Sequence, residues 1–395
     1  KKLQRINVLK LIRKRYRKTT MIKNKKRIIL VVGPCRSGTS ALTKALSVLG
    51  VVLTAPLFHF PPHNPKGDWE DAEFQNFNNK ILNTLSSLAK RARRLLSITE
   101  EEVNFLCKQG FLEQASQLLS GKLSDSQPLG LKYPRISILL PFWKKVFKEL
   151  DLHVSFVIAL RNPESVVASI TALTQEPAEK AFWIWISFLL SCLEHSEGYQ
   201  RILVDYNQLI THPVAQVKRI ANALELDIHH DLLQDYIDNF IDPTLCHFEP
   251  VSTIQSGENH IAKEQDDLLR NDFCGKLSIE MYQQLLAVAK DQMPFENLKK
   301  SFEKWKEQLL STQSLLWLAE KNEFSYQAFE QQAIEELHEI KGALNASIAE
   351  KMAFATNLHQ AIRQRDDRLA SLMQERLNQE AKIFQLMQQL EHVVH

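Results

Sequence analysis

The stretch that decides the fold is Arg27-Ile28-Ile29-Leu30-Val31-Val32-Gly33-Pro34-Cys35-Arg36-Ser37-Gly38-Thr39-Ser40-Ala41-Leu42. Its apolar, mostly β-branched start is typical of a parallel strand buried on both faces. Two glycines then bound a short loop, and apolar residues at helical spacing follow from Thr39. A strand, a glycine-bounded loop and a helix in this order predict a cradle for a phosphate group, because the loop amides and the helix N-terminus face the anion together.

The loop departs from the common nucleotide-triphosphate pattern in one respect. Gly33 and Gly38 match the spacing of G-x-x-x-x-G-K-[ST], but Thr39 occupies the position of the Lys. A cation stands earlier instead, at Arg36. The loop therefore suits a terminal group that is smaller or less charged than a triphosphate. The alternative is an α/β turn that needs glycine only for close packing.

The chain from residue 27 to about residue 250 alternates strands with helices. This alternation predicts an α/β, P-loop-like three-layer fold around a central parallel sheet of about five strands. Beyond the first strand, the expected strands lie at 50–53, 129–133, 154–160 and 202–204. The expected helices lie at 72–85, 138–150, 164–170, 177–195 and 213–224.

The C-terminal part has a different pattern. From about residue 302 the chain has no Pro and one Gly, and apolar residues from Leu337 to Val393 keep 3–4 spacing, with Lys351, Arg365 and Arg376 as interruptions. This predicts a long helix, with a coiled coil through which the chain self-associates as one outcome and a helix folded back on the body as the other. We therefore expect a basic leader or linker at 1–26, an α/β domain at 27–300 and a helical, coiled-coil extension at 301–395.

Charge separates the leader from the body. Residues 1–27 hold 13 of the 49 Lys and Arg and no Asp or Glu, which leaves 36 basic against 46 acidic residues elsewhere. An acidic body argues against specific nucleic-acid binding. For the leader, a solvated linker and a weak contact with an anionic membrane or a nucleic acid both remain open. The chain opens at Lys1, so the leader is expected to be a linker, the end of an upstream domain, or a segment ahead of a start at Met21.

Cysteine usage and hydropathy indicate the compartment. The five Cys form no C-x-x-C pair, no apolar run is long enough to span a bilayer, and the basic start lacks the apolar segment of a signal peptide. We expect free thiols and a cytoplasmic protein.

A second anion site is predicted after the strand at 154–160. Arg161 and Ser169 are eight residues apart, across the strand end and two helical turns, so both side chains can face one small anion at the sheet edge. With the loop at 33–40, this makes two separated anion sites. A nucleotide that carries phosphates on both its 5′ and 3′ positions needs that arrangement.

These motifs resemble those of the sulfotransferase superfamily, which uses 3′-phosphoadenosine 5′-phosphosulfate (PAPS). Residues 34–40 resemble the family's 5′-phosphosulfate loop, and residues 161–169 resemble its 3′-phosphate motif. Three further segments resemble family elements: Gly67-Asp68-Trp69-Glu70-Asp71, Lys132-Tyr133-Pro134-Arg135 (with Tyr133 in place of an Asp), and residues 204–210 followed by Pro213. The resemblance covers residues 27–250. It implies a PAPS-dependent O-sulfotransferase that needs no metal ion and acts on an acceptor hydroxyl, with carbohydrate as the acceptor of the bacterial members.

The resemblance also implies the roles of individual residues. Arg36 neutralises the leaving phosphate, and Glu70 is the general base, with His59 and His63 on the same loop as alternatives. Asp68 or Asp71 is expected to cap the next helix, and a structural hydrogen bond or cap is the alternative role for Glu70. The residues expected to bind the donor are Cys35, Arg36, Ser37, Gly38, Thr39, Ser40, Arg161 and Ser169.

Two other classes of protein compete with this interpretation. A P-loop kinase or nucleotidase would bind ATP with Mg²⁺, and the missing Lys argues against it. A scaffold whose long helix is functional and whose nucleotide-binding domain is inactive would bind the sulfonucleotide poorly.

Overall fold

The computed structural model describes residues 25–54, 64, 66–92, 95–242 and 273–394, and it divides into two compact units, Lys1–Phe324 and Ser325–His395. The first unit is built on a five-stranded parallel sheet in the order β2-β3-β1-β4-β5. The strands are β1 (Arg27–Val32), β2 (Val52–Leu53), β3 (Leu129–Lys132), β4 (His153–Leu160) and β5 (Gln200–Asp205). The predicted sheet is confirmed, and its centre is the strand that the opening stretch of sequence encodes.

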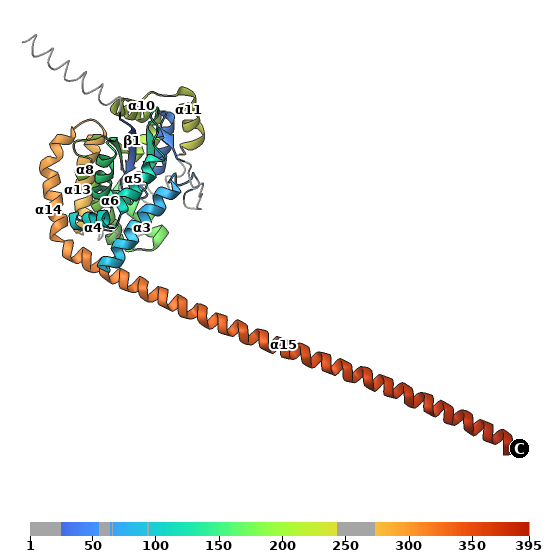
Figure 1. Cartoon of the computed structure of the whole chain (residues 1–395). Coiled ribbons are helices and arrows are strands. Elements are labelled where there is room, and N and C mark those ends of the chain that lie inside the picture. Colours follow the sequence, from blue (N-terminus) through green and yellow to red (C-terminus); the bar gives the residue numbers. More distant parts are fainter. Residues whose placement is uncertain (1–24, 55–63, 65, 93–94, 243–272, 395) are drawn as a thin grey trace, which may run out of the picture. The chain divides into compact units, whose positions relative to one another are not determined.

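The sheet is covered on both faces, which explains why β1 is apolar at successive positions. Ile28, Leu30 and Val32 pack into one hydrophobic cluster, and Ile29 and Val31 pack into a second. Alternate residues of a strand point to opposite faces, so two clusters on one strand mean two covered faces. Two groups of helices contribute side chains to the two clusters: α3 (Ala72–Ala89), α6 (Ile136–Glu149), α8 (Ala178–His195) and α13 (Phe273–Ala289) to the first, and α2 (Thr39–Val48), α10 (Pro213–Leu224) and α11 (His230–Asp235) to the second. Most of these helices are labelled around β1 in Figure 1. This is the predicted three-layer arrangement.

The helices begin and end close to where the sequence places them. Helix α10 is the expected 213–224, and α8 starts one residue later than expected because Pro177 serves as its N-cap. The helices of the first unit are α2 (Thr39–Val48), α3 (Ala72–Ala89), α4 (Glu100–Lys108), α5 (Phe111–Ser120), α6 (Ile136–Glu149), α7 (Pro163–Thr174), α8 (Ala178–His195), α9 (Tyr206–Thr211), α10 (Pro213–Leu224), α11 (His230–Asp235), the π-helix η1 (Tyr236–Phe240), α13 (Phe273–Ala289), the short 3₁₀ turn η4 (Phe295–Leu298) and α14 (Lys299–Ser311).

The first unit continues into the start of the long helix α15 (Gln313–Val394). Trp305 on α14 is fully buried, and so is the carboxylate-bearing residue Glu320 on α15. Glu320 accepts a hydrogen bond from the Leu95 amide at 2.9 Å, and its own carbonyl accepts one from the Ala92 amide. These contacts tie residues beyond 300 to the α/β body, and they place the end of the compact unit at Phe324.

The second unit is the remainder of α15, an unbroken helix from Ser325 onward. The predicted long helix is therefore present. No described helix combines the length and the apolar character that a membrane crossing requires.

One glycine of the phosphate loop is required by both backbone geometry and packing. Gly38 has φ of +81°, and a Cβ atom at this position would lie 2.2 Å from Cδ2 of Tyr206. We expect Gly38→Ala to lower the free energy of unfolding by about 2–4 kcal/mol, because a left-handed backbone and an overpacked contact both oppose the methyl group. Urea denaturation of the two proteins measures the difference.

Gly121 provides the matched control. Its φ is −67°, and an added Cβ would make ordinary contacts at 3.7 Å or more. Gly121→Ala should leave the unfolding free energy within about 0.5 kcal/mol of the wild-type value. Equal stabilities for the two variants would contradict the constraint at Gly38.

Candidate functional site

The loop between β1 and α2 has the backbone that an anion cradle needs. Gly33 has φ of +133°, and a Cβ there would lie 2.8 Å from the carbonyl oxygen of Ala159. Arg36 is itself left-handed, with φ of +63°. Helix α2 begins at Thr39 without a side-chain cap, so its first amides remain available to an anion.

Arg36 brings the two predicted anion-binding motifs together. Its Nε donates a hydrogen bond to Oγ of Ser169 at 2.9 Å, and its carbonyl oxygen accepts one from Nη1 of Arg161 at 2.9 Å. The sequence places these residues on two segments, 33–40 and 161–169, that are far apart in the chain. The structure brings them into direct contact at the carboxyl edge of β1 and β4, so the predicted pair of separated anion sites is one contiguous cluster in this structure.

Contacts hold both the side chain and the backbone of Arg161. Its guanidinium lies over the ring of Tyr206, 4.6 Å from the ring centroid, in a cation–π contact. Its carbonyl oxygen accepts a hydrogen bond from the indole of the buried Trp185. Asn162, the next residue, caps α7 through the Ser165 amide, and Pro163 occupies the first turn. The ring of Tyr206 and the Arg36 carbonyl therefore hold the Arg161 guanidinium, and the other contacts hold the backbone at the start of α7.

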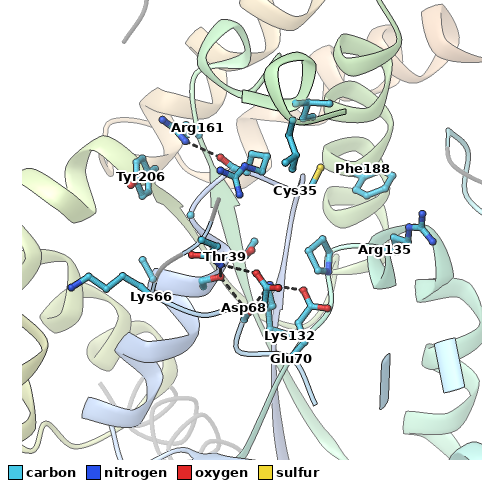
Figure 2. A pocket seen from close by; sticks show the side chains of 18 of the residues that line it. Cys35, Thr39, Lys66, Asp68, Glu70, Lys132, Arg135, Arg161, Phe188 and Tyr206 are labelled. Carbon is cyan, nitrogen blue, oxygen red and sulfur yellow. Dashed lines mark hydrogen bonds and ion pairs between the residues drawn. The ribbon is translucent and has the colours of Figure 1, made fainter. Parts of the chain in front are cut away.

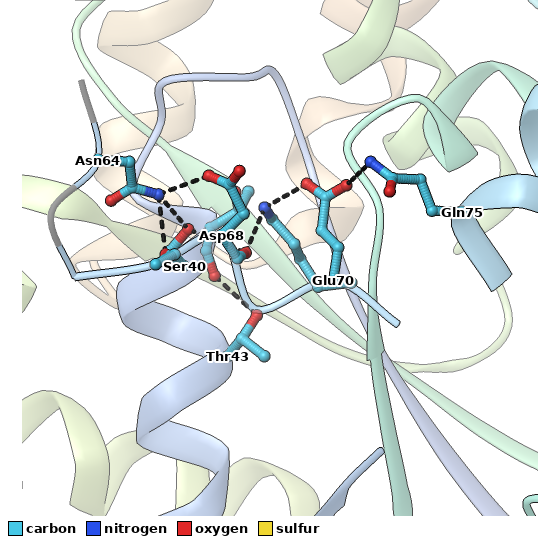
Figure 3. A network of polar contacts seen from close by, with 9 residues as sticks. Ser40, Thr43, Asn64, Asp68, Glu70 and Gln75 are labelled. Atoms are coloured by element: carbon cyan, nitrogen blue, oxygen red, sulfur yellow. Dashed lines mark hydrogen bonds and ion pairs between the residues drawn. The ribbon is translucent and has the colours of Figure 1, made fainter. Parts of the chain in front are cut away.

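Glu70 lies in an ion pair that was not predicted. Its Oε1 accepts a hydrogen bond from Nζ of Lys132 at 2.6 Å, and its Oε2 accepts one from Nε2 of Gln75 at 2.9 Å (Figure 3). Both charged residues are buried, with 9% of Glu70 and 4% of Lys132 exposed. Each carboxylate oxygen keeps a second lone pair, so Glu70 can still accept a proton or a further hydrogen bond.

The same lysine joins Glu70 to the phosphate loop. Nζ of Lys132 also donates to the carbonyl oxygen of Asp68 at 2.8 Å, and that oxygen accepts a hydrogen bond from Oγ of Ser40. The Asp68 carboxylate accepts from Nδ2 of Asn64 at 2.7 Å. A continuous polar network therefore connects α2, the 64–71 loop and β3 (Figure 3).

Asp71 is a helix cap, as predicted. It accepts a hydrogen bond from the Phe74 amide at the start of α3, and Lys122 donates to its other oxygen. Burial raises the pKa of Asp71, but these hydrogen bonds outweigh burial and hold the pKa below its usual range. The Asp71 carboxylate therefore has a structural role, and Asp68 does not cap the helix.

The network and the cluster line one cavity of about 510 Å³. Figure 2 shows Arg161 and Tyr206 toward its upper left and Glu70 with Lys132 toward its lower right. Seven predicted residues line it: Cys35, Arg36, Gly38, Thr39, Ser40, Glu70 and Arg161. Ser37 and Ser169 are buried beside it, and the Ser37 hydroxyl has no hydrogen-bond partner among the described residues. His59 and His63 lie outside the described residues.

The thiol of Cys35 lines the cavity without being activated. Burial raises the pKa of Cys35, and the neighbouring cations Arg36, Arg135 and Lys132 offset this only in part. A raised pKa disfavours the thiolate, which is the nucleophilic form of cysteine.

The sequence interpretation did not assign roles to several lining residues. Lys132, Gln75, Arg135 and Tyr206 all line the cavity. Lys132 and Arg135 lie at the end of the strand expected at 129–133. Residues at strand ends reach the edge where such sheets bind ligands, so this position in the sequence could have identified them. Tyr206 follows β5 directly, in the position where a strand-end residue reaches the same edge.

No family model and no curated protein matches the chain. Solved structures that do match include the sulfotransferase domain of an olefin synthase from Synechococcus PCC 7002, at 17% identity and a TM-score of 0.35, over 63% of this chain and 96% of that domain. A sulfotransferase from Mycobacterium tuberculosis H37Rv matches at 16% identity and a TM-score of 0.35, over 60% and 77% of the two chains. A mouse sulfotransferase complexed with PAP matches at 15% and 0.30, over 66% and 89%. The fold of this chain is established by its own strand order and registers.

Proposed function

We propose that this protein is a sulfotransferase that moves the sulfuryl group of PAPS to an acceptor hydroxyl. One observation carries the proposal: a single cavity joins an anion-binding cluster at one end to a buried carboxylate at the other. Transfer of a sulfuryl group needs both, because the leaving phosphate carries charge and the acceptor must lose a proton.

The donor end would hold the nucleotide through groups already in place. The amides at the start of α2 and the hydroxyls of Ser37, Thr39 and Ser40 would bind the 5′-phosphate. Arg161 and Ser169 would bind the 3′-phosphate, and the contacts of both with Arg36 keep the two ends of the nucleotide in register. The unpartnered Ser37 hydroxyl supports this, because a buried donor without a partner favours a bound anion.

The acceptor end would work through Glu70. The acceptor O–H gives its proton to the carboxylate while its oxygen forms a bond to sulfur. The bond between sulfur and the bridging oxygen of the 5′-phosphate breaks, and Arg36 neutralises the charge that collects on the leaving phosphate. The products are a sulfate ester and adenosine 3′,5′-bisphosphate. Lys132 is a positioning residue here, since it holds Oε1 of Glu70 and the Asp68 carbonyl together.

The acceptor class follows from the resemblance and from the lining of the cavity. Gln75, which is bonded to Glu70, and Arg135 offer hydrogen-bond donors in the wall of the cavity, and the ring of Phe188 lines the same cavity. Donors beside an aromatic face suit a sugar ring, so we propose a carbohydrate hydroxyl as the acceptor.

The experiment that tests the function compares nucleotides by thermal stabilisation. Adenosine 3′,5′-bisphosphate at about a hundred times its Kd should raise the free energy of unfolding by about 2.7 kcal/mol. ATP with Mg²⁺ should stabilise the protein much less, because Thr39 replaces the lysine that grips β- and γ-phosphates. Stronger stabilisation by ATP with Mg²⁺ would favour a kinase instead, and no response to either nucleotide would favour an inactive scaffold.

Arg161→Ala and Ser169→Ala should weaken binding of adenosine 3′,5′-bisphosphate. Loss of a hydrogen bond to a charged group costs about 1.5–3 kcal/mol, which is roughly a 10- to 150-fold increase in Kd. Isothermal titration calorimetry measures the change. Lys218→Ala is the control, because it removes an exposed cation from α10 that does not line the cavity. Wild-type affinity in both test variants would contradict the assignment of the 3′-phosphate site.

Glu70→Gln and Arg36→Ala should affect turnover and donor affinity to different degrees. Glu70→Gln should lower turnover by about 10²–10⁴ and leave donor affinity nearly unchanged, because the base does not touch the donor. Arg36→Ala should lower turnover by about 10²–10³ and donor affinity more modestly, because its charge acts mainly on the leaving group. A radiolabelled donor and a glycan panel provide the assay.

Asp68→Asn is the matched control for Glu70→Gln, since it makes the same change two residues away on the same loop. It should retain most of the turnover. Glu70→Gln leaves Lys132 without its ion-pair partner, so unfolding is measured in parallel and rates are compared only where each variant is folded. Retention of more than about a tenth of wild-type turnover would exclude Glu70 as the base, and His59 and His63 would be changed next.

A further inference from the structure

Residues 334–379 of α15 keep one heptad register, in which four cations interrupt the apolar positions. Two positions per heptad recur at alternating steps of three and four residues, the spacing of a coiled-coil seam. The first position holds Ile334, Lys341, Ile348, Ala355, Ile362, Leu369 and Arg376. The second position holds Leu337, Leu344, Lys351, Leu358, Arg365, Leu372 and Gln379. We call these fourteen residues the seam.

Nothing within the described part of the second unit covers the large apolar residues of the seam. Their exposed fractions run from 42% at Ile334 to 64% at Leu337. A water-exposed helix of this length gains little from backbone propensity alone, and most helical stability in proteins comes from burial of an apolar face. The seam is therefore a mainly apolar stripe that a partner helix would cover.

We infer that the partner is the seam of a second copy of this chain, bound in the antiparallel direction. A second copy supplies a helix of the same length and the same seam. The choice of direction follows from the four cations that interrupt the apolar pattern.

A parallel, in-register pair would place each seam residue against itself. Four layers would then join two like charges, at Lys341, Lys351, Arg365 and Arg376. Like charges that face each other across a helix interface are destabilising, and the seam contains no Asp or Glu to compensate them.

An antiparallel pair has none of these four like-charge layers. The first heptad position of one helix then faces the second position of the other. In the register that pairs the described seam along its whole length, each cation faces an aliphatic residue, over which its alkyl stem can lie while the charge reaches water. The four layers are Lys341 with Leu372, Lys351 with Ile362, Arg365 with Ile348, and Arg376 with Leu337.

This pairing has two-fold symmetry, as a closed dimer requires. The axis crosses the helices between residues 356 and 357, so the same surface is buried on both copies. A shift by one heptad that moves the axis to residue 360 still joins no two cations, whereas the opposite shift, with the axis at residue 353, would join Lys341 with Arg365. The inferred dimer therefore has its symmetry axis near the middle of the seam, and the N-terminal ends of the two seams point away from each other.

Light scattering of the full chain at tens of micromolar tests the pairing. The wild type should show twice the monomer mass. Leu358→Asp/Ile362→Asp should reduce it to one monomer mass, whereas Gln360→Asp/Gln364→Asp, which adds the same charge on the other face, should leave it doubled. A monomeric wild type would overturn the inference, and so would a trimer or a tetramer.

Distances between spin labels test the direction. Labels are attached through an introduced non-natural residue at Glu339 or Gln360, both outside the seam. With a rise of 1.5 Å per residue, the antiparallel dimer places two labels at 360 about 20–30 Å apart and two labels at 339 about 50–65 Å apart. A parallel dimer would give similar short distances at both positions and would overturn the inferred direction.

Discussion

The structure depends on the burial of β1 on both faces of a parallel sheet. Its five apolar residues are fully buried, and its neighbours β3 and β4 run in the same direction. Side chains within such a strand cannot carry chemistry, so the polar groups of the fold gather where the strands end. Because β1 lies between β3 and β4, the loops after all three strands reach one edge, which is where open α/β sheets bind ligands. Arg36, Lys132 and Arg161 follow from this single constraint.

Burying the Lys132–Glu70 ion pair is unfavourable unless the other donors and acceptors of the two groups also have partners. Removing two charges from water carries a penalty of several kcal/mol per ion, which is offset only when the remaining lone pairs and protons are satisfied. Here Gln75 satisfies the second oxygen of Glu70, and the Asp68 carbonyl takes a second proton of Lys132. A buried pair of this kind is weak evidence for stability, and its location in the cavity is a better reason for its presence.

The sequence predicts the parts of the fold that depend on local pattern. Apolar strands, the cap at Asp71 and the proline at the first turn of α7 are all readable over a few residues. The pairing of Glu70 with Lys132 is not, because 62 residues separate them and only the β2-β3 neighbourhood brings them together. The Arg36–Ser169 contact spans 133 residues and depends on a left-handed backbone at Arg36, which no propensity predicts for arginine. The burial of Trp305 and Glu320 is not readable from local pattern either, because the surfaces that cover these residues form only when the α/β body folds.

Two residues with side chains adopt the left-handed conformation in the loops that lead to the cavity, and this pattern connects the backbone to the proposed chemistry. Arg36 and Trp69 have φ of +63° and +57°, values that cost about 1–2 kcal/mol for a residue with a Cβ. Such a conformation persists only where the surroundings hold it. Arg161 holds Arg36 through its carbonyl. Trp69 is held by its indole bond to Lys66, the Phe240 ring against it and the Lys44 ammonium over it.

The turn at Trp69 has a direct consequence for its neighbours. It places the Asp68 carbonyl and the Glu70 carboxylate on the same side of the chain, so that one lysine binds both. The packing of the Trp69 indole holds this turn, so the strain at Trp69 is the cost of bringing the Asp68 carbonyl and the Glu70 carboxylate to one ammonium group.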